Sequence, residues 1–418
     1  MPRSAIRSIG GVVPLTLRLA LRNLPRHGLR TLLTLAAVAL GVAGLVLAGG
    51  FIEDIFVQLG EGTIHSQLGH VQVYKKGYYA NGAHRPLAYL IEKPQQVASE
   101  IAQLPEVDTT LLRLTFSGLL NNGRSDLAVL VEAGESDKES KVATFHALID
   151  GRMLRAGDRF GIYVGEGVAK NLRLKSGQIV SVLANTRDGA LNSLEFEVVG
   201  VFRSYSKEYD ARVVRINLEA GNQLLDTEAV NSIVVLLQDT DATARVASRL
   251  QDRLGRADME VKTWIELSDF YAKTVALFSR QFGFLELVIL LMIVLSVLNS
   301  INLSMYERQG EFGTMRALGN RNREVFALIV MESLALGLIG SALGILIGVV
   351  LAGMISFAGI PMPPPPNAEL GYIAQIRIVP GIVAGAAAIG ILASTFAAVL
   401  PGIRLSRMSI TDALRQIN

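Results

Sequence analysis

Four long apolar stretches and one long block of mixed polarity divide this chain. The apolar stretches run approximately over Leu32–Phe51, Phe282–Leu303, Val325–Phe357 and Val379–Leu400. Each reaches the length of about 20 residues that a helix needs to cross the hydrocarbon core of a bilayer. The block between the first two stretches alternates short β-like runs, helical runs and Gly, Asn and Asp turns. The pattern predicts a membrane α-helical protein with four transmembrane helices and a large extracytoplasmic α+β domain between the first and second.

Hydrophobic periodicity within the mixed block predicts the individual elements. Alternating runs predict strands at His70–Tyr74, Leu127–Glu132, Ile179–Leu183, Leu194–Val201, Arg212–Ile216, Ser232–Leu237 and Glu260–Thr263. Helices are predicted at Gln95–Gln103, Gly167–Leu172, Leu218–Leu225, Ala242–Leu254 and Leu267–Arg280. Since no regular βαβ alternation occurs, we expect an α+β fold in two subdomains. The last helical run leads into the second apolar stretch, which predicts one continuous helical rod.

The net charge of the chain is only +3, but its basic residues are unevenly placed. Residues 1–30, 305–324 and 401–418 together hold 13 of the 40 basic residues and 4 of the 37 acidic ones. Basic residues near the ends of transmembrane helices are retained in the cytoplasm. Both termini and the 305–324 loop are therefore predicted to be cytoplasmic, and residues 53–280 and 358–378 to lie outside.

These assignments divide the chain into nine segments. They are a cytoplasmic amphipathic elbow helix (1–30), transmembrane helix 1 (31–52), a periplasmic α+β domain (53–280), transmembrane helix 2 (281–304), a cytoplasmic loop (305–324), transmembrane helix 3 (325–357), a periplasmic Pro-rich loop (358–378), transmembrane helix 4 (379–400) and a cytoplasmic tail (401–418). For the N-terminal segment, a disordered basic tail and a cleaved signal peptide stay open as alternatives. The run PMPPPP at 361–366 cannot be helical and predicts a stiff link. The chain has no cysteine, and a large exported domain without disulfides is more typical of a bacterium than of a eukaryotic secretory route.

The sequence shows no constellation that an enzyme acting alone would need. Neither a G-x-x-x-x-G-K-[ST] P-loop nor a G-x-S-x-G elbow occurs, so we expect no nucleotide bound in a P-loop and no catalytic residue. The five histidines, His27, His65, His70, His84 and His146, lack the spacing of metal ligands, so we expect no metal site. We also expect no nucleic-acid partner. Gly165-Glu166-Gly167 predicts a turn rather than a cofactor loop.

Two acidic residues fall inside apolar stretches, Glu286 in the second and Glu332 in the third. An acid at the bilayer centre costs about 2.5–3.5 kcal/mol on insertion scales, so such residues usually face protein or water. For Glu332 we favour a hydrogen bond to a hydroxyl or amide of a neighbouring helix over a pair with an arginine or a proton or substrate contact. Glu286 is expected to reach the headgroup region.

The third apolar stretch also carries a ladder of glycines, Gly337, Gly340, Gly344 and Gly348. Small residues at this spacing let transmembrane helices approach closely. We therefore expect Gly340, Gly344 and Gly348 to pack against another helix, either within the subunit or across a dimer.

The loop between the second and third stretches reads MYERQGEFGTMRALGNRNRE over residues 305–324. Phe312, Met315 and Leu318 recur every three residues and form a short apolar stripe among charges. Arg308 and Glu311 are spaced to form an i,i+3 pair. The pattern is typical of a structured loop that docks on a partner, although a capped, solvated loop stays an alternative.

Here the chain resembles the FtsX-like permease family, which includes the membrane subunits of lipoprotein-releasing and macrolide-exporting ABC transporters. The family pattern E-R-x-x-E-[IF]-[GA]-x-[ML]-R-A-[LM]-G is matched at Glu307, Arg308, Glu311, Phe312, Gly313, Met315, Arg316, Ala317, Leu318 and Gly319. Weaker similarities lie at Leu17–Thr31, at Glu332 with Gly340–Gly348, at Val164–Leu183 with Phe196–Phe202, and at Pro401 with Ser409–Arg415, where Ser409-Ile410 departs from the usual Pro-containing step.

The resemblance implies that the loop carrying Glu307–Gly319 couples to a separate cytoplasmic ABC ATPase, which would bind the ATP and magnesium. It also implies a dimer of such subunits in a bacterial inner membrane, with ATP-driven closure transmitted to the outer domains. The lipoprotein-release branch looks most similar, so the expected substrate is lipidated or amphipathic, with a periplasmic carrier as a further partner. An efflux permease with an adaptor, a regulator of a cell-wall hydrolase and a membrane enzyme stay open as alternatives.

Overall fold

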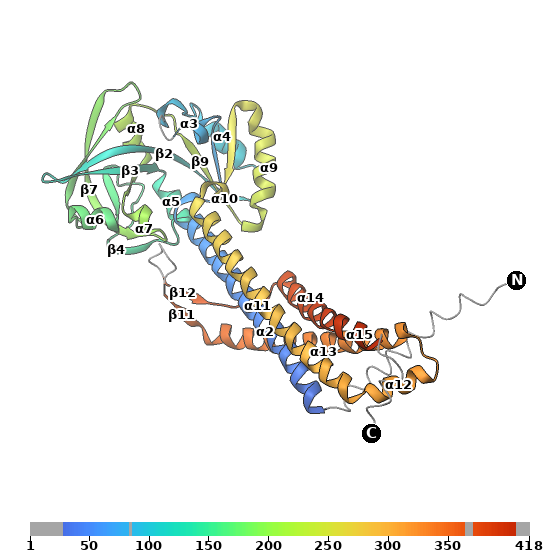
Figure 1. The fold of residues 1–418 in the computed structure, drawn as a ribbon. Coiled ribbons are helices and arrows are strands. Elements are labelled where there is room, and N and C mark those ends of the chain that lie inside the picture. The colour runs from blue at the N-terminus through green and yellow to red at the C-terminus, as the bar shows by residue number, and fades with distance from the viewer. Residues whose placement is uncertain (1–27, 83–85, 364–370, 407–418) are drawn as a thin grey trace. The chain divides into compact units, whose positions relative to one another are not determined.

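The computed structural model describes residues 28–82, 86–363 and 371–406 of the chain (Figure 1). The predicted elbow helix, apart from its last three residues, and most of the predicted tail lie outside the described residues. The chain divides into two compact units. The helical unit comprises the chain up to Phe56, Ala276–Ile360 and the chain from Ile373, and the inserted domain comprises Val57–Val275 with Pro361–Tyr372.

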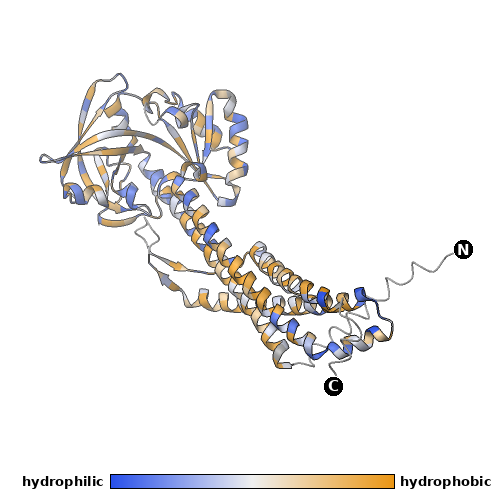
Figure 2. Cartoon of the chain, in the orientation of Figure 1, coloured by the Kyte–Doolittle hydropathy of each residue, from blue (hydrophilic) through white to orange (hydrophobic). Residues whose placement is uncertain are grey.

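Long apolar helices make up the helical unit. They are α2 (Gly28–Thr63), α11 (Asp269–Glu307), α13 (Asn322–Ala358) and α14 (Pro380–Ala397), accompanied by the shorter α12 (Gln309–Ala317) and α15 (Val399–Ser406). In the described part of the chain, four helical segments are long and apolar enough to cross a membrane, at Thr31–Leu68, Asp269–Glu307, Asn322–Ala358 and Pro380–Leu405. Figure 2 shows these helices mostly in the hydrophobic colour. The four predicted apolar helices are thus present, and their topology in a membrane stays a prediction.

Within the helical unit, α2 and α11 lie side by side and antiparallel. Thr34 Oγ1 donates to Ser300 Oγ at 2.7 Å near one end, and the rings of Phe56 and Phe278 meet at 6.5 Å near the other. Between them, a Cβ placed on Gly41 would lie only 2.9 Å from the side chain of Ile293. The absence of a side chain at this position is what allows the two helices to approach.

The first helix is longer than the sequence pattern predicts. We expected transmembrane helix 1 to end at residue 52, but α2 continues through Gly60 and Gly62 to Thr63. Each glycine faces an aromatic ring, because a Cβ would lie 2.9 Å from Trp264 at Gly60 and 2.7 Å from Tyr205 at Gly62. Close ring packing therefore explains glycines that otherwise resemble helix breakers.

The inserted domain mixes strands with short helices. Its strands are β1 (Val71–Lys75), β2 (Val107–Asn121), β3 (Asp126–Gly134), β4 (Ala147–Gly151), β5 (Gly161–Gly165), β6 (Ile179–Asn185), β7 (Leu191–Arg203), β8 (Val213–Asn217), β9 (Ser232–Leu237) and β10 (Met259–Thr263). Its helices are α3 (Tyr78–Asn81), α4 (Pro94–Ile101), α5 (Ser136–Val142), α6 (Glu166–Leu172), α7 (Lys207–Asp210), α8 (Leu218–Leu225), α9 (Thr243–Leu254) and α10 (Trp264–Leu267). The α+β class is as predicted.

All ten strands join in one sheet rather than in two subdomains. The order is β10-β1-β9-β2-β3-β8-β5-β7-β4, with β6 pairing β2 and β7. Most neighbours are antiparallel, whereas β3 pairs β8 and β5 pairs β7 in parallel. One large buried apolar cluster runs along most of the sheet, which explains why the domain forms a single compact unit.

The seven predicted strands and five predicted helices correspond to observed elements, with shifted ends. The predicted helix Leu267–Arg280 begins at Asp269 and continues without a break through the second apolar stretch to Glu307, as the expected rod. The long strand β2 is absent from our predictions. It reads VDTTLLRLTFSGLLN and buries residues of both faces around Leu112, so the alternation of polar and apolar residues is lost.

The 358–378 segment contains two short strands, β11 (Ile360–Met362) and β12 (Tyr372–Ala374), which pair with each other. The proline run is not helical as far as Pro363, and its remaining residues lie outside the described part of the chain.

Candidate functional site

The predicted docking loop folds as a helix, α12, between α11 and α13. Arg308 interrupts the helical backbone after α11, with φ −107° and ψ 12°, so that α12 starts as a separate helix. At its other end, Gly319 adopts φ +100° and its N–H donates to Arg316 O at 3.0 Å, while the N–H of Asn320 donates to Met315 O at 3.1 Å. Glycine suits this left-handed turn because it lacks a Cβ.

Arg308 holds the start of α12 to α13. Its side chain is only 9% exposed, and its Nη1 donates to Glu332 Oε2 at 3.0 Å. Its Nε donates to Glu311 Oε2 at 3.1 Å, and its guanidinium lies 5.1 Å from the centre of the Phe312 ring. Our preference for a hydroxyl or amide partner of Glu332 is therefore wrong. The arginine comes from the loop motif itself, which a reading of α13 alone does not reveal.

The predicted apolar stripe divides into an inner and an outer part. Phe312 is 4% exposed and belongs to the buried cluster of the helical unit, against which Met315 also packs. Leu318, in contrast, is 81% exposed at the end of α12. Gly313 is buried and Ala317 is exposed. Phe312 and Met315 thus anchor the helix in the apolar cluster, whereas the apolar side chain of Leu318 faces outward.

The remaining members of the family pattern lie around α12. Glu307, the last residue of α11, is exposed, and Arg316 is half-buried in the last turn of α12. The described part of this segment therefore presents both signs of charge beside one exposed leucine. A surface of this composition can bind a protein partner by combining charge pairing with apolar burial.

The glycine ladder of α13 packs against α2 of the same chain. A Cβ on Gly340 would lie 2.8 Å from Val38, one on Gly344 would lie 2.6 Å from the backbone oxygen of Ala39, and one on Gly348 would lie 3.2 Å from Val46. Of the two alternatives, packing within the subunit is the one that the described contacts support.

Glu286 is half-buried on α11. It forms no hydrogen bond or ion pair with any other described residue, so its carboxylate has no partner that would hold it inside the protein. That environment agrees with the expected position near the headgroups, which stays a prediction.

The structure also reveals a polar contact that we did not predict. Asp54, fully buried on α2, accepts hydrogen bonds from Arg377 Nε and from the N–H of Gln375, both at 3.0 Å. The N–H of Ile376 donates to Ser356 Oγ of α13 at 3.0 Å. These bonds join α2, α13 and the segment before α14. An aspartate directly after an apolar stretch was the available signal, but its partner lies 323 residues away.

Among the described residues, no group of three or more His, Asp or Glu side chains could hold a metal ion. The site around α12 combines an exposed outer face at Leu318 with the buried Arg308–Glu332 pair.

Comparison with known proteins yields two matching families. The FtsX-like permease C-terminal family matches residues 283–410, and the MacB-like periplasmic core domain family matches residues 31–253. Together these matches cover the apolar helices, α12 and most of the inserted domain.

Three curated relatives show the range of similarity. The chain is 25% identical to the macrolide export ATP-binding/permease protein MacB of Brucella abortus over 82% of this chain and 53% of that protein. It is 24% identical to the uncharacterized ABC transporter permease YvrN of Bacillus subtilis over 96% of this chain and 98% of that protein. It is 20% identical to the lipoprotein-releasing system transmembrane protein LolE of Haemophilus influenzae over 75% of each chain. The chain thus spans about half the length of the macrolide-export relative.

Proposed function

Because this chain belongs to the FtsX-like permeases that carry a MacB-like periplasmic core domain, we propose that it couples a separate cytoplasmic ABC ATPase to movement of its inserted domain. Both termini and α12 would face the cytoplasm, and the inserted domain would lie in the periplasm of a bacterium. The work would be done on a lipidated or amphipathic substrate at the outer leaflet of the inner membrane, by a dimer of such subunits.

The observation that supports this proposal best is the construction of α12. A short helix between two apolar helices is anchored through Phe312 and the Arg308–Glu332 pair and exposes Leu318. A force applied to its outer surface would be carried into α13 by the buried pair. No P-loop occurs in the sequence, so the energy of ATP would enter through this surface rather than through a nucleotide site of the P-loop type.

The first test is the substitution Leu318→Glu. The side chain is 81% exposed, so the change should leave folding intact while placing a charge in the docking surface. We expect an at least tenfold loss of ATPase recovered with the full-length chain after detergent extraction, about 1.4 kcal/mol of binding free energy. Leu318→Met is the matched control and should bind normally. Undiminished ATPase recovery with Leu318→Glu would contradict the docking site.

A second test separates charge from apolar contact. The double variant Glu311→Lys with Arg316→Glu reverses two charges of α12 and should weaken ATPase association without preventing membrane insertion. Normal co-purification of this variant would count against a role for charge in docking.

Efflux is the alternative that a specific observation favours, since the macrolide-export relative matches over 82% of this chain. The two functions predict different phenotypes of a deletion strain. Retention of acylated proteins in the inner membrane supports the release of lipidated substrates, whereas an increase in macrolide sensitivity with normal acylated-protein sorting supports efflux.

A further inference from the structure

The last turn of the α2 segment is a π-helical turn, Ile64–Leu68, which we call the π-turn. It lies entirely within the inserted domain. In its last backbone hydrogen bond, the N–H of Gly69 donates to Ile64 O at 2.9 Å. This bond spans five residues, instead of the four of an α-helix. Carbonyl groups at the end of a helix have no partner within the helix, and together they carry the negative end of its dipole.

Two buried arginines donate to consecutive carbonyls of the π-turn. Arg113 Nη1 of β2 donates to Gln67 O at 2.5 Å, and Arg215 Nη2 of β8 donates to Ser66 O at 2.9 Å. Their residues are only 4% and 3% exposed. Positive charge is favourable at this end of a helix, because it faces the partial negative charge of the carbonyls.

Neighbouring groups hold the remaining carbonyls. Ser66 O also lies 2.9 Å from His146 Nε2, the N–H of Phe145 donates to His65 O at 3.2 Å, and Gln72 Nε2 donates to Leu68 O at 2.8 Å. All five carbonyls of the π-turn therefore accept a hydrogen bond. Ile64 O accepts from Gly69, directly after the turn, and the other four accept from residues further away in the sequence.

The two arginines are themselves fixed by carboxylates on other elements. Glu139 of α5 lies 2.8 Å from Arg113 Nη2 and 3.0 Å from Arg215 Nη1, and Glu132 of β3 lies 3.2 Å from Arg215 Nε. Tyr209 of α7 donates to Glu132 at 2.6 Å and accepts from Arg215 Nη2 at 2.8 Å. Two positive and two negative charges balance, so the cluster connects the π-turn to β2, β3, β8, α5 and α7 without a net buried charge.

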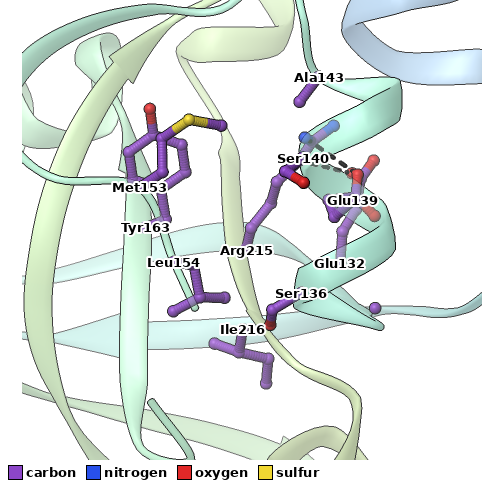
Figure 3. Close-up of a pocket in the computed structure, with 11 residues that line it drawn as sticks. Glu132, Ser136, Glu139, Ser140, Ala143, Met153, Leu154, Tyr163, Arg215 and Ile216 are labelled. Carbon is purple, nitrogen blue, oxygen red and sulfur yellow. Dashed lines mark hydrogen bonds and ion pairs between the residues drawn. The ribbon is translucent and has the colours of Figure 1, made fainter. Parts of the chain in front are cut away.

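The cavity beside the cluster is too small to make it a ligand site. Figure 3 shows Arg215 directed toward Glu139, with Tyr163, Leu154 and Met153 on the opposite wall. The cavity volume is about 20 Å³, which suffices for one water molecule. The hydroxyls of Tyr163 and Ser136, which both line the cavity, are buried without a hydrogen-bond partner among the described residues. The chemistry of the cluster is thus directed at the π-turn rather than at a guest.

We propose that Arg113 and Arg215 are positioning residues that fasten the end of α2 to the sheet of the inserted domain, and we call them with Glu132, Glu139 and Tyr209 the arginine anchor. The anchor rests on the proposed function for its purpose, since displacement of α2 would be delivered through it to β2 and β8. Replacing a buried ion-pair cluster by apolar residues is often neutral or stabilising, so stability alone does not call for these charges. A directional attachment to main-chain carbonyls does.

Hydrogen exchange of the full-length chain in detergent tests the anchor without any ATPase. We expect Arg113→Lys, which keeps the charge but loses the fork that bridges Gln67 O and Glu139, to raise exchange at Ile64–Gly69 at least tenfold. Peptides from β6 and α9 should exchange as in the wild type. Arg152→Lys, in a partly exposed ion pair with Asp158 of the same domain, is the matched control and should leave the π-turn protected.

A second variant keeps the test decisive if arginine substitutions unfold the domain. His146→Phe removes one donor to Ser66 O but can keep the stacking on Phe202, whose ring lies 4.7 Å away. It should raise exchange at the π-turn by a smaller factor. Unchanged π-turn exchange in both Arg113→Lys and His146→Phe would overturn the proposal.

The functional consequence is measured in the complex with the ATPase. The complex that contains Arg113→Lys should still hydrolyse ATP. The nucleotide-dependent change in hydrogen exchange at β2 and β8 should disappear. A wild-type chain that binds no ATPase would refute the proposed function but leave the exchange result standing. A wild-type-like nucleotide response in Arg113→Lys would refute the anchor alone.

Discussion

At the scale of single residues, three buried arginines join separate elements of this molecule. Arg308, Arg113 and Arg215 are each less than a tenth exposed and are each paired with a carboxylate. Taking a charge out of water costs several kcal/mol, so a buried arginine needs a counter-charge close beside it. In each case the pairing connects separate helices or strands of the chain.

The Arg308–Glu332 pair makes a direct prediction. Glu332→Gln should lower the stability of the helical unit by about 3 kcal/mol, because it removes the more buried of the two carboxylates that face the Arg308 guanidinium. Glu311 is the other partner of Arg308, and its side chain is 54% exposed. Glu311→Gln should therefore lower the stability by about 1 kcal/mol or less. Thermal unfolding of the purified chain in detergent compares the two. Equal losses in both variants would show that burial of the pair does not matter.

His70 predicts a pH dependence of the inserted domain. Its Nδ1 accepts from the N–H of Leu237 at 3.1 Å and its Nε2 lies 3.0 Å from Thr240 Oγ1, so a second proton would face a donor. Burial, reinforced by nearby His65, lowers the pKa of His70 to about 4. Since the unfolded histidine titrates near 6.5, the unfolded state binds more protons between pH 6.5 and 4.

The free energy of unfolding should therefore be unaffected by His70 above pH 6.5. It should fall by about 3 kcal/mol as the pH decreases to 4. Trp264, the only tryptophan and 5% exposed in the inserted domain, reports unfolding by its fluorescence. His70→Gln retains a donor and an acceptor but does not titrate, so it should flatten this slope. A residual slope is expected from His146, whose pKa burial and Arg215 lower well below 6.5. An unchanged slope in His70→Gln would exclude His70 as the cause.

At the scale of elements, glycine spacing determines how α13 meets α2. Gly344→Ala should destabilise the helical unit by about 1–3 kcal/mol, because the added Cβ would lie 2.6 Å from the backbone oxygen of Ala39. Gly353→Ala on the same helix is the control, since nothing lies within 4 Å of its Cβ position. Thermal unfolding in detergent should show a loss for the first and none for the second. Similar behaviour of the two variants would indicate that α2 and α13 do not pack as described.

The limits of sequence-based prediction are clearest for these elements. Periodicity and length suffice for the four apolar helices and seven strands, because each pattern is local. The segment that forms α12 was expected only as a structured loop. The end of α2 was misplaced because Gly60 and Gly62 are accommodated by Trp264 and Tyr205, which lie more than 140 residues away. β2 was missed because burial on both faces removes its alternation.

The candidate site was predictable only where its signal is local. The residues of α12 were found from their motif and spacing, and Leu318 was found as part of a stripe. The partner of Glu332 and the Asp54–Arg377 contact depend on how separate helices approach, which no local pattern specifies. The arginine anchor was not predicted for the same reason, since Arg113 and Arg215 look like ordinary polar positions of two strands.

At the scale of the whole molecule, two helices belong to both units. α2 and α11 are continuous across the boundaries at Phe56 and Val275, so the inserted domain is connected to the helical unit by regular helix at both ends of its main segment. A helix resists bending over such lengths better than a loop does. In the proposed function, force would therefore pass between the two units through α2 and α11, which lead to the π-turn and to α12 respectively.

The central claim is that binding and hydrolysis of ATP by a partner on α12 alters the inserted domain. Because the chain has no cysteine, spin labels can be placed at Ser125→Cys in the inserted domain and Phe357→Cys, 96% exposed, in the helical unit. The distance between the labels in the reconstituted complex should change when ATP is trapped by vanadate, and Leu318→Glu should abolish that change. The account would be contradicted if the distance changed equally in Leu318→Glu. It would also be contradicted if the distance did not change in the labelled chain that keeps Leu318 and has the ATPase bound.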